Sequence, residues 1–196
     1  MPQTTSPLDQ FLGDYNTHAA PLSIPQKCHL LGALAIQMEW NQEFADDYTL
    51  TKADNDHPFE EPATQRAIAL LDGHPLQELA SWMLELARAI EEELEELASS
   101  RHDANHFGQQ YNTYAYELTI PEKCHLLGVL AIQMEWDQDH PCDNYTVTDA
   151  DSDHPFLELV TENAVFRLEG KSPHELSTWM LELATAVENE LSKLPE

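Results

Sequence analysis

The fourteen residues KCHLLGALAIQMEW (Lys27–Trp40) occur a second time as KCHLLGVLAIQMEW (Lys123–Trp136), 96 positions further along the chain and with one substitution. Two further segments are repeated at a spacing of 97: YTLTKADNDHPF (Tyr48–Phe59) with YTVTDADSDHPF (Tyr145–Phe156), and ELASWMLELA (Glu78–Ala87) with ELSTWMLELA (Glu175–Ala184). The spacing grows by one within a loop, where folded proteins tolerate insertions best. We therefore predict a tandem duplication, with one copy at residues 1–100 and another at 101–196, packed about a pseudo-twofold axis.

Capping boxes predict where the helices of each copy begin. Ser23–Gln26 and Thr119–Glu122 each place a hydroxyl three residues before a Gln or Glu, with a proline that the first helical turn tolerates. These boxes begin helices that include the repeated fourteen residues. A third box, Ser172–Glu175, begins the last helix of the second copy. Its apolar residues recur at helical spacing: Leu176, Trp179, Met180, Leu183, Val187 and Leu191.

Between these helices, the pattern predicts a shorter one at about Ala63–Leu71 and again at Thr161–Leu168, each ended by a glycine. Alternating apolar residues leave short β elements open at Tyr114–Ile120 and Tyr145–Val147. The predicted fold class is therefore mainly α, with two homologous three-helix units. An α+β fold is the alternative.

The repeated fourteen-residue segment is apolar nearly all round a helical wheel, which is typical of a central helix. Cys28, Gly32, Ala35 and Glu39 form a narrow stripe on it, which recurs in the second copy as Cys124, Gly128, Ala131 and Glu135. Small residues on such a stripe let another helix approach closely, so we expect a tight crossing between the copies. The two glutamates must then pair with a base, or lie exposed at a helix end.

The charge balance is strongly acidic, with 36 Asp and Glu residues against 9 Lys and Arg. Residues 1–100 hold 18 acidic and 4 basic side chains, and residues 101–196 hold 18 and 5, so the charge is not confined to a tail. Such a surface repels nucleic acids and anionic membranes and attracts basic proteins. We therefore expect no direct binding to DNA or RNA.

Cysteine usage and the absence of targeting patterns favour the cytoplasm. Cys28, Cys124 and Cys142 are too few and odd in number for a disulfide framework. The first residues lack the basic start and apolar core of a secretory signal, and no apolar run is long enough to span a membrane. We expect a cytoplasmic protein that is either a monomer with an internal pseudo-dimer or a homodimer.

Cysteine, histidine and glutamate residues of the repeats raise the hypothesis of a metal site. Adjacent residues on a helix point about 100° apart, so one ion cannot easily take both Cys28 and His29. Such a site would need ligands from elsewhere, such as His57 or His154, and the sequence shows no closed ligand set. The candidate metal ligands are Cys28, His29, Glu39, His57, Cys124, His125, Glu135 and His154.

The segment TDADSDH (Thr148–His154) has the opening acidic spacing of an EF-hand loop. However, His154 stands where that loop needs glycine, and Val160 stands where it needs its bidentate glutamate. We therefore exclude an EF-hand, and expect Asp56 and Asp153 to cap short turns.

The leading functional hypothesis is a non-enzymatic binding protein that docks on a basic partner. Carboxylates along helices can imitate a run of phosphates, as inhibitors and immunity proteins directed against nucleases or DNA-binding proteins do. The candidate contact residues are Glu91, Glu92, Glu93, Glu95, Glu96, Glu188, Glu190, Asp149, Asp151 and Asp153.

The alternative hypothesis is a helical protein that binds a metal or a small ligand and has a salt-adapted acidic surface. The sequence shows neither a glycine-rich phosphate loop nor a GxSxG nucleophile elbow, so we expect no enzyme and no cofactor.

Overall fold

The computed structural model describes residues 21–44, 48–99, 118–141, 143–156 and 161–193, and within these ranges all regular secondary structure is helical. The first copy contributes α2 (Ile24–Glu43), α3 (Leu50–Asp56), the 3₁₀ turn η1 (Pro62–Thr64), α4 (Gln65–Leu71) and α5 (Leu76–Ser99). The second copy contributes α6 (Ile120–Asp139), α7 (Val147–Asp153), α8 (Glu162–Leu168) and α9 (Pro173–Leu191). The prediction of a mainly α fold is thus confirmed for the described residues. None of these helices is both long and apolar enough to cross a membrane.

The predicted capping boxes begin three of the four long helices. Ser23 precedes α2, Thr119 precedes α6 and Ser172 precedes α9, each with the reciprocal bonds of a capping box. Gly73 and Gly170 follow α4 and α8 with φ of 81° and 72°, a conformation that favours glycine. Local sequence therefore sets most helix ends.

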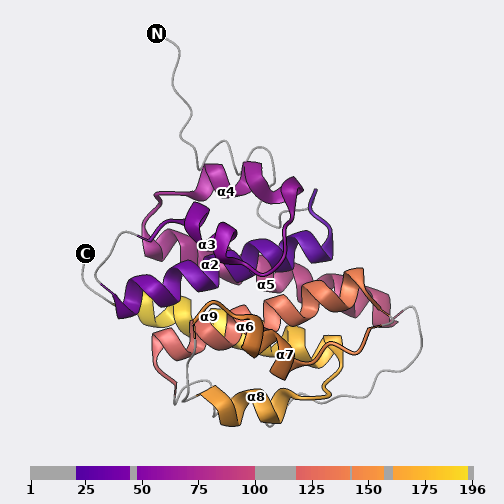
Figure 1. Cartoon of the computed structure of the whole chain (residues 1–196). Helices are drawn as coiled ribbons and strands as arrows, with labels where there is room; N and C mark the ends of the chain where they lie inside the picture. Colours follow the sequence, from indigo (N-terminus) through magenta and orange to yellow (C-terminus); the bar gives the residue numbers. More distant parts are fainter. Residues whose placement is uncertain (1–20, 45–47, 100–117, 142, 157–160, 194–196) are drawn as a thin grey trace.

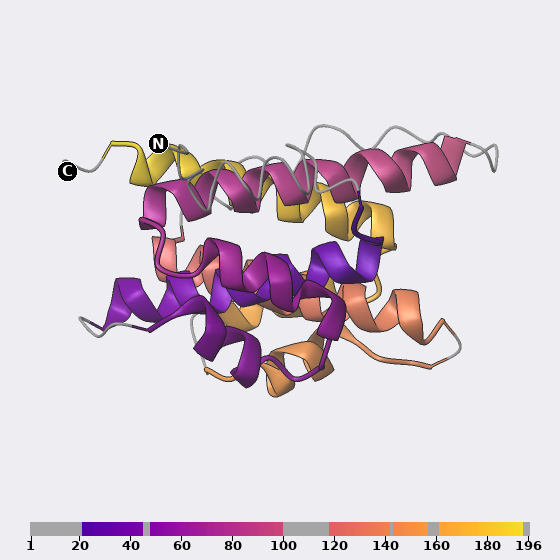
Figure 2. The same cartoon turned by 90° about the horizontal axis from the view of Figure 1, so that it is seen from above.

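Helices α2 and α6 form the centre of the molecule (Figure 1). They pack most extensively on each other, and α5 and α9 form the next most extensive pair. Figure 2 shows α5 and α9 running along one side of the central pair. In Figure 1, α4 and α8 lie at opposite ends of the view, above and below that pair.

The burial of α2 and α6 explains why their sequence has no polar face. Every residue of Lys27–Glu39 is buried, and so is every residue of Glu122–Glu135. The predicted close crossing is present, because a Cβ placed on Gly32 would lie 3.5 Å from Ala131 Cβ. The repeated segment is therefore the core of the molecule, as predicted.

Aromatic residues after α3 and α7 contact the opposite copy. Phe59 packs on Trp136, with ring centroids 5.1 Å apart, and Phe156 packs on Trp40 at 4.8 Å. These contacts place the segments that follow α3 and α7 against the ends of α6 and α2. The two copies are therefore interlocked through more than one pair of helices.

The prediction of three helices per copy was wrong, because α3 and α7 are additional helices. Val147, where the alternation left a β element open, begins α7. A two-residue alternation is too short to outweigh the capping box of Thr146 with Asp149. The other proposed β element, Tyr114–Ile120, lies mostly outside the described residues.

The expected turn caps at Asp56 and Asp153 were also wrong. Both are the last residues of short helices, and they accept hydrogen bonds from the hydroxyls of Tyr48 and Tyr145. Each tyrosine thus fastens the end of a short helix, and the histidine that follows it, to the preceding loop.

Candidate metal centres

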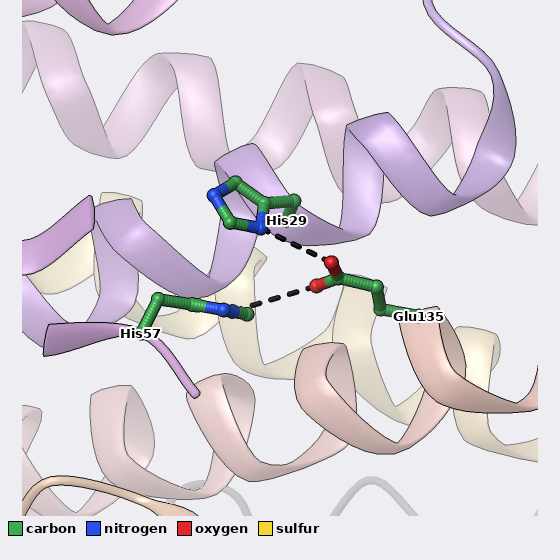
Figure 3. A group of neighbouring side chains, drawn as sticks. All are labelled: His29, His57 and Glu135. Atoms are coloured by element: carbon green, nitrogen blue, oxygen red, sulfur yellow. Dashed lines mark hydrogen bonds and ion pairs between the residues drawn. The ribbon is translucent and has the colours of Figure 1, made fainter. Parts of the chain in front are cut away.

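Two histidines and a glutamate from three different elements converge at the crossing of α2 and α6. His29 lies on α2, His57 is the C-cap of α3, and Glu135 lies on α6 (Figure 3). One donor atom of each lies within 4.8 Å of the other two. We call this group the first centre; its carboxylate comes from the second copy and its imidazoles from the first.

A second centre has the same residue types, with the roles of the two copies exchanged. Its carboxylate is that of Glu39 on α2, and its imidazoles are those of His125 on α6 and His154 at the C-cap of α7. Its dimensions are the same. The Nδ1–Oε1 distance is 3.1 Å in both centres, and the Nε2–Oε2 distance is 3.5 Å in both. The two copies thus exchange equivalent carboxylates.

Gly32 and Gly128 make room for one imidazole in each centre. A Cβ on Gly32 would lie 2.7 Å from His57 Nε2, and a Cβ on Gly128 would lie 2.7 Å from His154 Nε2. No side chain larger than hydrogen fits there unless the ring moves. The small-residue stripe therefore serves two purposes, since it admits both the facing helix and the histidine.

In each of the four histidines of the two centres, the ring nitrogen that faces away from the glutamate also has a polar neighbour. Nε2 of His29 lies 2.8 Å from Asp54 Oδ1, and Nε2 of His125 lies 2.9 Å from Asp151 Oδ1. Nδ1 of His57 lies 3.4 Å from the backbone nitrogen of Phe59, and Nδ1 of His154 lies 3.3 Å from the backbone nitrogen and 3.1 Å from the carbonyl oxygen of Phe156. Each ring is held from behind, with its other nitrogen facing the glutamate.

The protonation of the histidines differs within each centre. Burial lowers the pKa of His125, but hydrogen bonds to two carboxylates outweigh burial and raise it to about 9. The pKa of His29 is raised for the same reasons. Burial and the charge of His125 lower the pKa of His154 to about 3, and the pKa of His57 is also lowered well below its usual value. His57 and His154 are therefore neutral at physiological pH, which is the form that binds metals.

Several buried donor atoms of the centres are unsatisfied. Within the part of the chain that the structure describes, His57 Nε2, His154 Nε2 and Glu135 Oε2 have no hydrogen-bond partner. The 3.5 Å between His57 and Glu135 is too long for a good hydrogen bond. Buried polar atoms are normally satisfied, so His57 Nε2 and Glu135 Oε2, which face each other in the first centre, and His154 Nε2 in the second centre are open to a ligand.

The geometry fits a first-row transition metal. Donors about 2.1 Å from a tetrahedral ion lie roughly 3.4 Å from one another. The two nitrogen–oxygen distances in the first centre are close to that value, at 3.1 Å from His29 Nδ1 to Glu135 Oε1 and 3.5 Å from His57 Nε2 to Glu135 Oε2. Imidazole with carboxylate suits zinc, iron, cobalt or nickel, whereas calcium and magnesium prefer oxygen donors alone.

The two predicted cysteine ligands lie apart from these donor groups. Cys28 and Cys124 are fully buried, and burial raises the pKa of each thiol well above its usual value. Neither belongs to a group of donor atoms close enough to share an ion within the described residues. Of the eight candidate metal ligands, the other six are the ones that converge.

Most of the acidic residues predicted to contact a partner bond within the chain. Six of the ten do so: Glu91 to Thr178, Glu93 to Lys27, Glu190 to Lys123, Asp149 to Thr146, Asp151 to His125 and Asp153 to Tyr145. Glu92, Glu95 and Glu96 are exposed on α5, and Glu188 is half-buried on α9. Four of the ten predicted contact residues are thus left without a bond described above, and whether any of the ten contacts a partner stays a prediction.

Asp54 was missed as a site residue, and Asp151 was assigned to the outer surface. The signal was present in the sequence, because DNDH (Asp54–His57) and DSDH (Asp151–His154) repeat an aspartate three residues before the histidine. Comparisons of the chain with protein-family models, curated proteins and solved structures find no match.

Proposed function

We propose that this chain is a non-enzymatic metal-binding protein that holds one divalent first-row transition-metal ion in each of its two centres. The observation that carries this proposal is the convergence of six buried donor residues into two groups with equal dimensions. These residues are at most 6% exposed. Enclosed sites of this kind bind an ion durably, and three protein donors leave a further coordination position for water.

Each ion is proposed to bind in its own centre, with its own set of three donor residues. His29 of the first centre and Glu39 of the second lie ten residues apart on α2, whereas His57 and His154 reach the crossing beside Gly32 and Gly128. Each ion would join α2 to α6.

This proposal includes the two-copy organisation predicted from the repeats. Equal distances in the two centres support copies at residues 1–100 and 101–196 arranged about a pseudo-twofold axis. Each centre takes two ligands from one copy and one from the other, so each ion fastens the copies together. A cytoplasmic location remains part of the proposal, argued from the cysteine usage.

The direct test is the metal stoichiometry of the untagged protein after chelator treatment and titration with Zn²⁺. Isothermal titration calorimetry is expected to give two ions per chain. Glu135→Gln and Glu39→Gln should each leave one ion, and the double variant none, because an amide keeps the shape of the carboxylate but loses its charge. Glu92→Gln, an exposed glutamate on α5, is the matched control and should keep two ions. A wild-type stoichiometry near zero would contradict the proposal.

A second candidate function is docking on a basic partner such as a nuclease or another nucleic-acid-binding protein. The exposed positions of Glu92, Glu95 and Glu96 on α5 support it. A pull-down at low and high salt tests it. Retention of one nucleic-acid-binding protein at low salt only, and its loss from a variant with these three residues changed to Gln, is the expected result. If the variant retained the partner as well as the wild type does, these three glutamates would not be the docking surface.

A further inference from the structure

The short helices α3 and α7 each present an aspartate to a histidine of the neighbouring centre. Asp54 Oδ1 lies 2.8 Å from Nε2 of His29, and Asp151 Oδ1 lies 2.9 Å from Nε2 of His125. The opposite nitrogen, Nδ1, faces the glutamate of the centre at 3.1 Å in both copies. Each imidazole is therefore held between an outer and an inner carboxylate.

The outer carboxylate determines which nitrogen can bind a metal. A neutral imidazole carries its proton on one nitrogen and offers a lone pair on the other. A carboxylate oxygen only accepts hydrogen bonds, so Asp54 favours the tautomer with the proton on Nε2. A metal ion that binds beside Glu135 would therefore displace the proton on Nδ1, and the Nδ1 lone pair would point into the centre. Partners of this kind behind metal-bound histidines fix the ring and strengthen the ligand.

We propose that Asp54 and Asp151 are positioning residues that commit His29 and His125 to bind metal through Nδ1. This inference rests on the proposed metal-binding function and specifies how that function is built. One short helix thus supplies two parts of each centre: a ligand at its C-cap and, three residues earlier, the residue that orients the other histidine. The repeated DxxH spacing at Asp54–His57 and Asp151–His154 follows from this double task.

A purely structural role in the short helices does not account for these aspartates. The N-terminus of α3 is held by the hydroxyl of Thr49, which accepts from Lys52, and by Asp72, which accepts from the backbone of Leu50. The N-terminus of α7 is capped by Thr146 and its capping box. Neither Asp54 nor Asp151 takes part in these caps. Their position in the last turn is unfavourable for an acid, because the helix dipole there favours cations.

The test uses a protein that keeps one centre. In the Glu39→Gln background only the first centre remains, and Co²⁺ binding is followed through visible d–d absorption. Asp54→Ala is expected to weaken Co²⁺ binding about 10–100-fold. Asp54→Asn should recover part of the loss, because its amide oxygen can still accept from Nε2–H. Asn55→Ala, at an exposed position on the same helix whose amide bonds only to the carbonyl oxygen of Thr51, is the matched control and should leave the affinity within about twofold.

A second measurement reports the ligating atom itself, which a merely structural role would not change. Long-range ¹H–¹⁵N spectra of the Zn²⁺-loaded protein are expected to show His29 bound through Nδ1, with a proton on Nε2. In Asp54→Ala this pattern should be lost or mixed. The Asp151→Ala variant in the Glu135→Gln background repeats both measurements on the second centre, which protects the test against one variant that fails to fold.

The outcomes separate the two proposals. If the parent Glu39→Gln protein shows no Co²⁺ absorption at all, the metal-binding function is wrong and this inference falls with it. If the parent binds one ion but Asp54→Ala binds as tightly as Asn55→Ala, only the positioning role is overturned. Ligation of His29 through Nε2 would overturn it as well.

Discussion

Glu135 and Glu96 both lie on long helices, yet their surroundings are opposite. Glu135 is 4% exposed and faces His29 and His57, whereas Glu96 is exposed near the end of α5. The formal charge of −27 led the sequence analysis to assign function to acidic residues at the surface. The comparison teaches that the burial of a carboxylate beside histidines says more about a site than the net charge of the chain does. An exposed glutamate is stable in water, but a buried one must be compensated.

The largest expected difference between the two regions is their response to metal. Zn²⁺ at about 100 times its Kd should stabilise the wild-type protein by roughly 3 kcal/mol for each occupied centre. The His57→Ala, His154→Ala double variant should lose this gain, and Glu96→Gln should retain it. Urea unfolding with Zn²⁺ and with chelator measures the difference. An equal gain in the double variant would place the metal elsewhere.

The next effect concerns pH in the chelator-treated protein. His125 faces Glu39 from α2, and Asp151 and the ring of His154 from α7, and its pKa rises to about 9 in the folded state. Since its ordinary value is about 6.5, its contribution is complete below pH 6.5 and is lost as the pH rises through 9. The loss is of the order of 3 kcal/mol.

Urea unfolding between pH 6.5 and 10 measures this loss. The His125→Asn variant, which does not titrate, should show a flatter profile over that range. A wild-type profile as flat as that of the variant would mean that the two carboxylates do not hold His125 charged.

A smaller effect on stability is expected from the glycine at the helix crossing. Gly32→Ala places a methyl group 2.7 Å from His57 Nε2 and so forces the ring to move. Overpacking costs about 1–3 kcal/mol, but alanine regains roughly 1 kcal/mol of helix propensity. The free energy of unfolding should therefore change by less than about 2 kcal/mol.

Metal binding should be more sensitive than stability to this change. The affinity of the first centre is expected to fall at least tenfold, in line with about 1.4 kcal/mol of lost ligand geometry. The second centre is the internal control and should bind normally. Calorimetry that shows two unchanged sites would indicate that His57 is not a ligand.

The smallest effect is expected at the exposed end of α5. Changing Glu92, Glu95 and Glu96 together to Gln removes like charges from a helix C-terminus, where the dipole disfavours them. The free energy of unfolding should rise by about 0.3–1 kcal/mol, most of it at low salt. Metal stoichiometry should remain two. A loss of metal from this variant would mean that the exposed glutamates of α5 also contribute to metal binding.

Sequence reasoning predicted the elements that local chemistry determines. Capping residues such as Ser23 and Ser172 and the long apolar patterns place the major helices, because these signals act within a few residues. The seven-residue helices α3 and α7 were missed. They bury only two residues each, such as Leu50 and Ala53 in α3, so hydrophobic periodicity does not reveal them.

Sequence reasoning named all six donor residues as candidate metal ligands, but it did not predict which of them lie together in each centre. Cys28 stands beside His29 in the sequence and attracts attention as a shared ligand, yet helical geometry turns the two apart. The residue that faces His29 is Glu135, 106 positions away. No local rule links residues at that separation.

The sequence by itself determined the repeated segments, the helical class, the central position of the fourteen-residue repeat and the acidic character. These properties follow from composition and short-range periodicity. Only the tertiary structure decided that the glutamate of each repeat faces the histidines of the other, and that α3 and α7 each bring a histidine and an aspartate to a centre. The reason is physical: donor atoms can share an ion only if the distances between side chains from three elements are fixed to within a few tenths of an ångström. Only the packing of α2 against α6, with glycine at the crossing, fixes those distances.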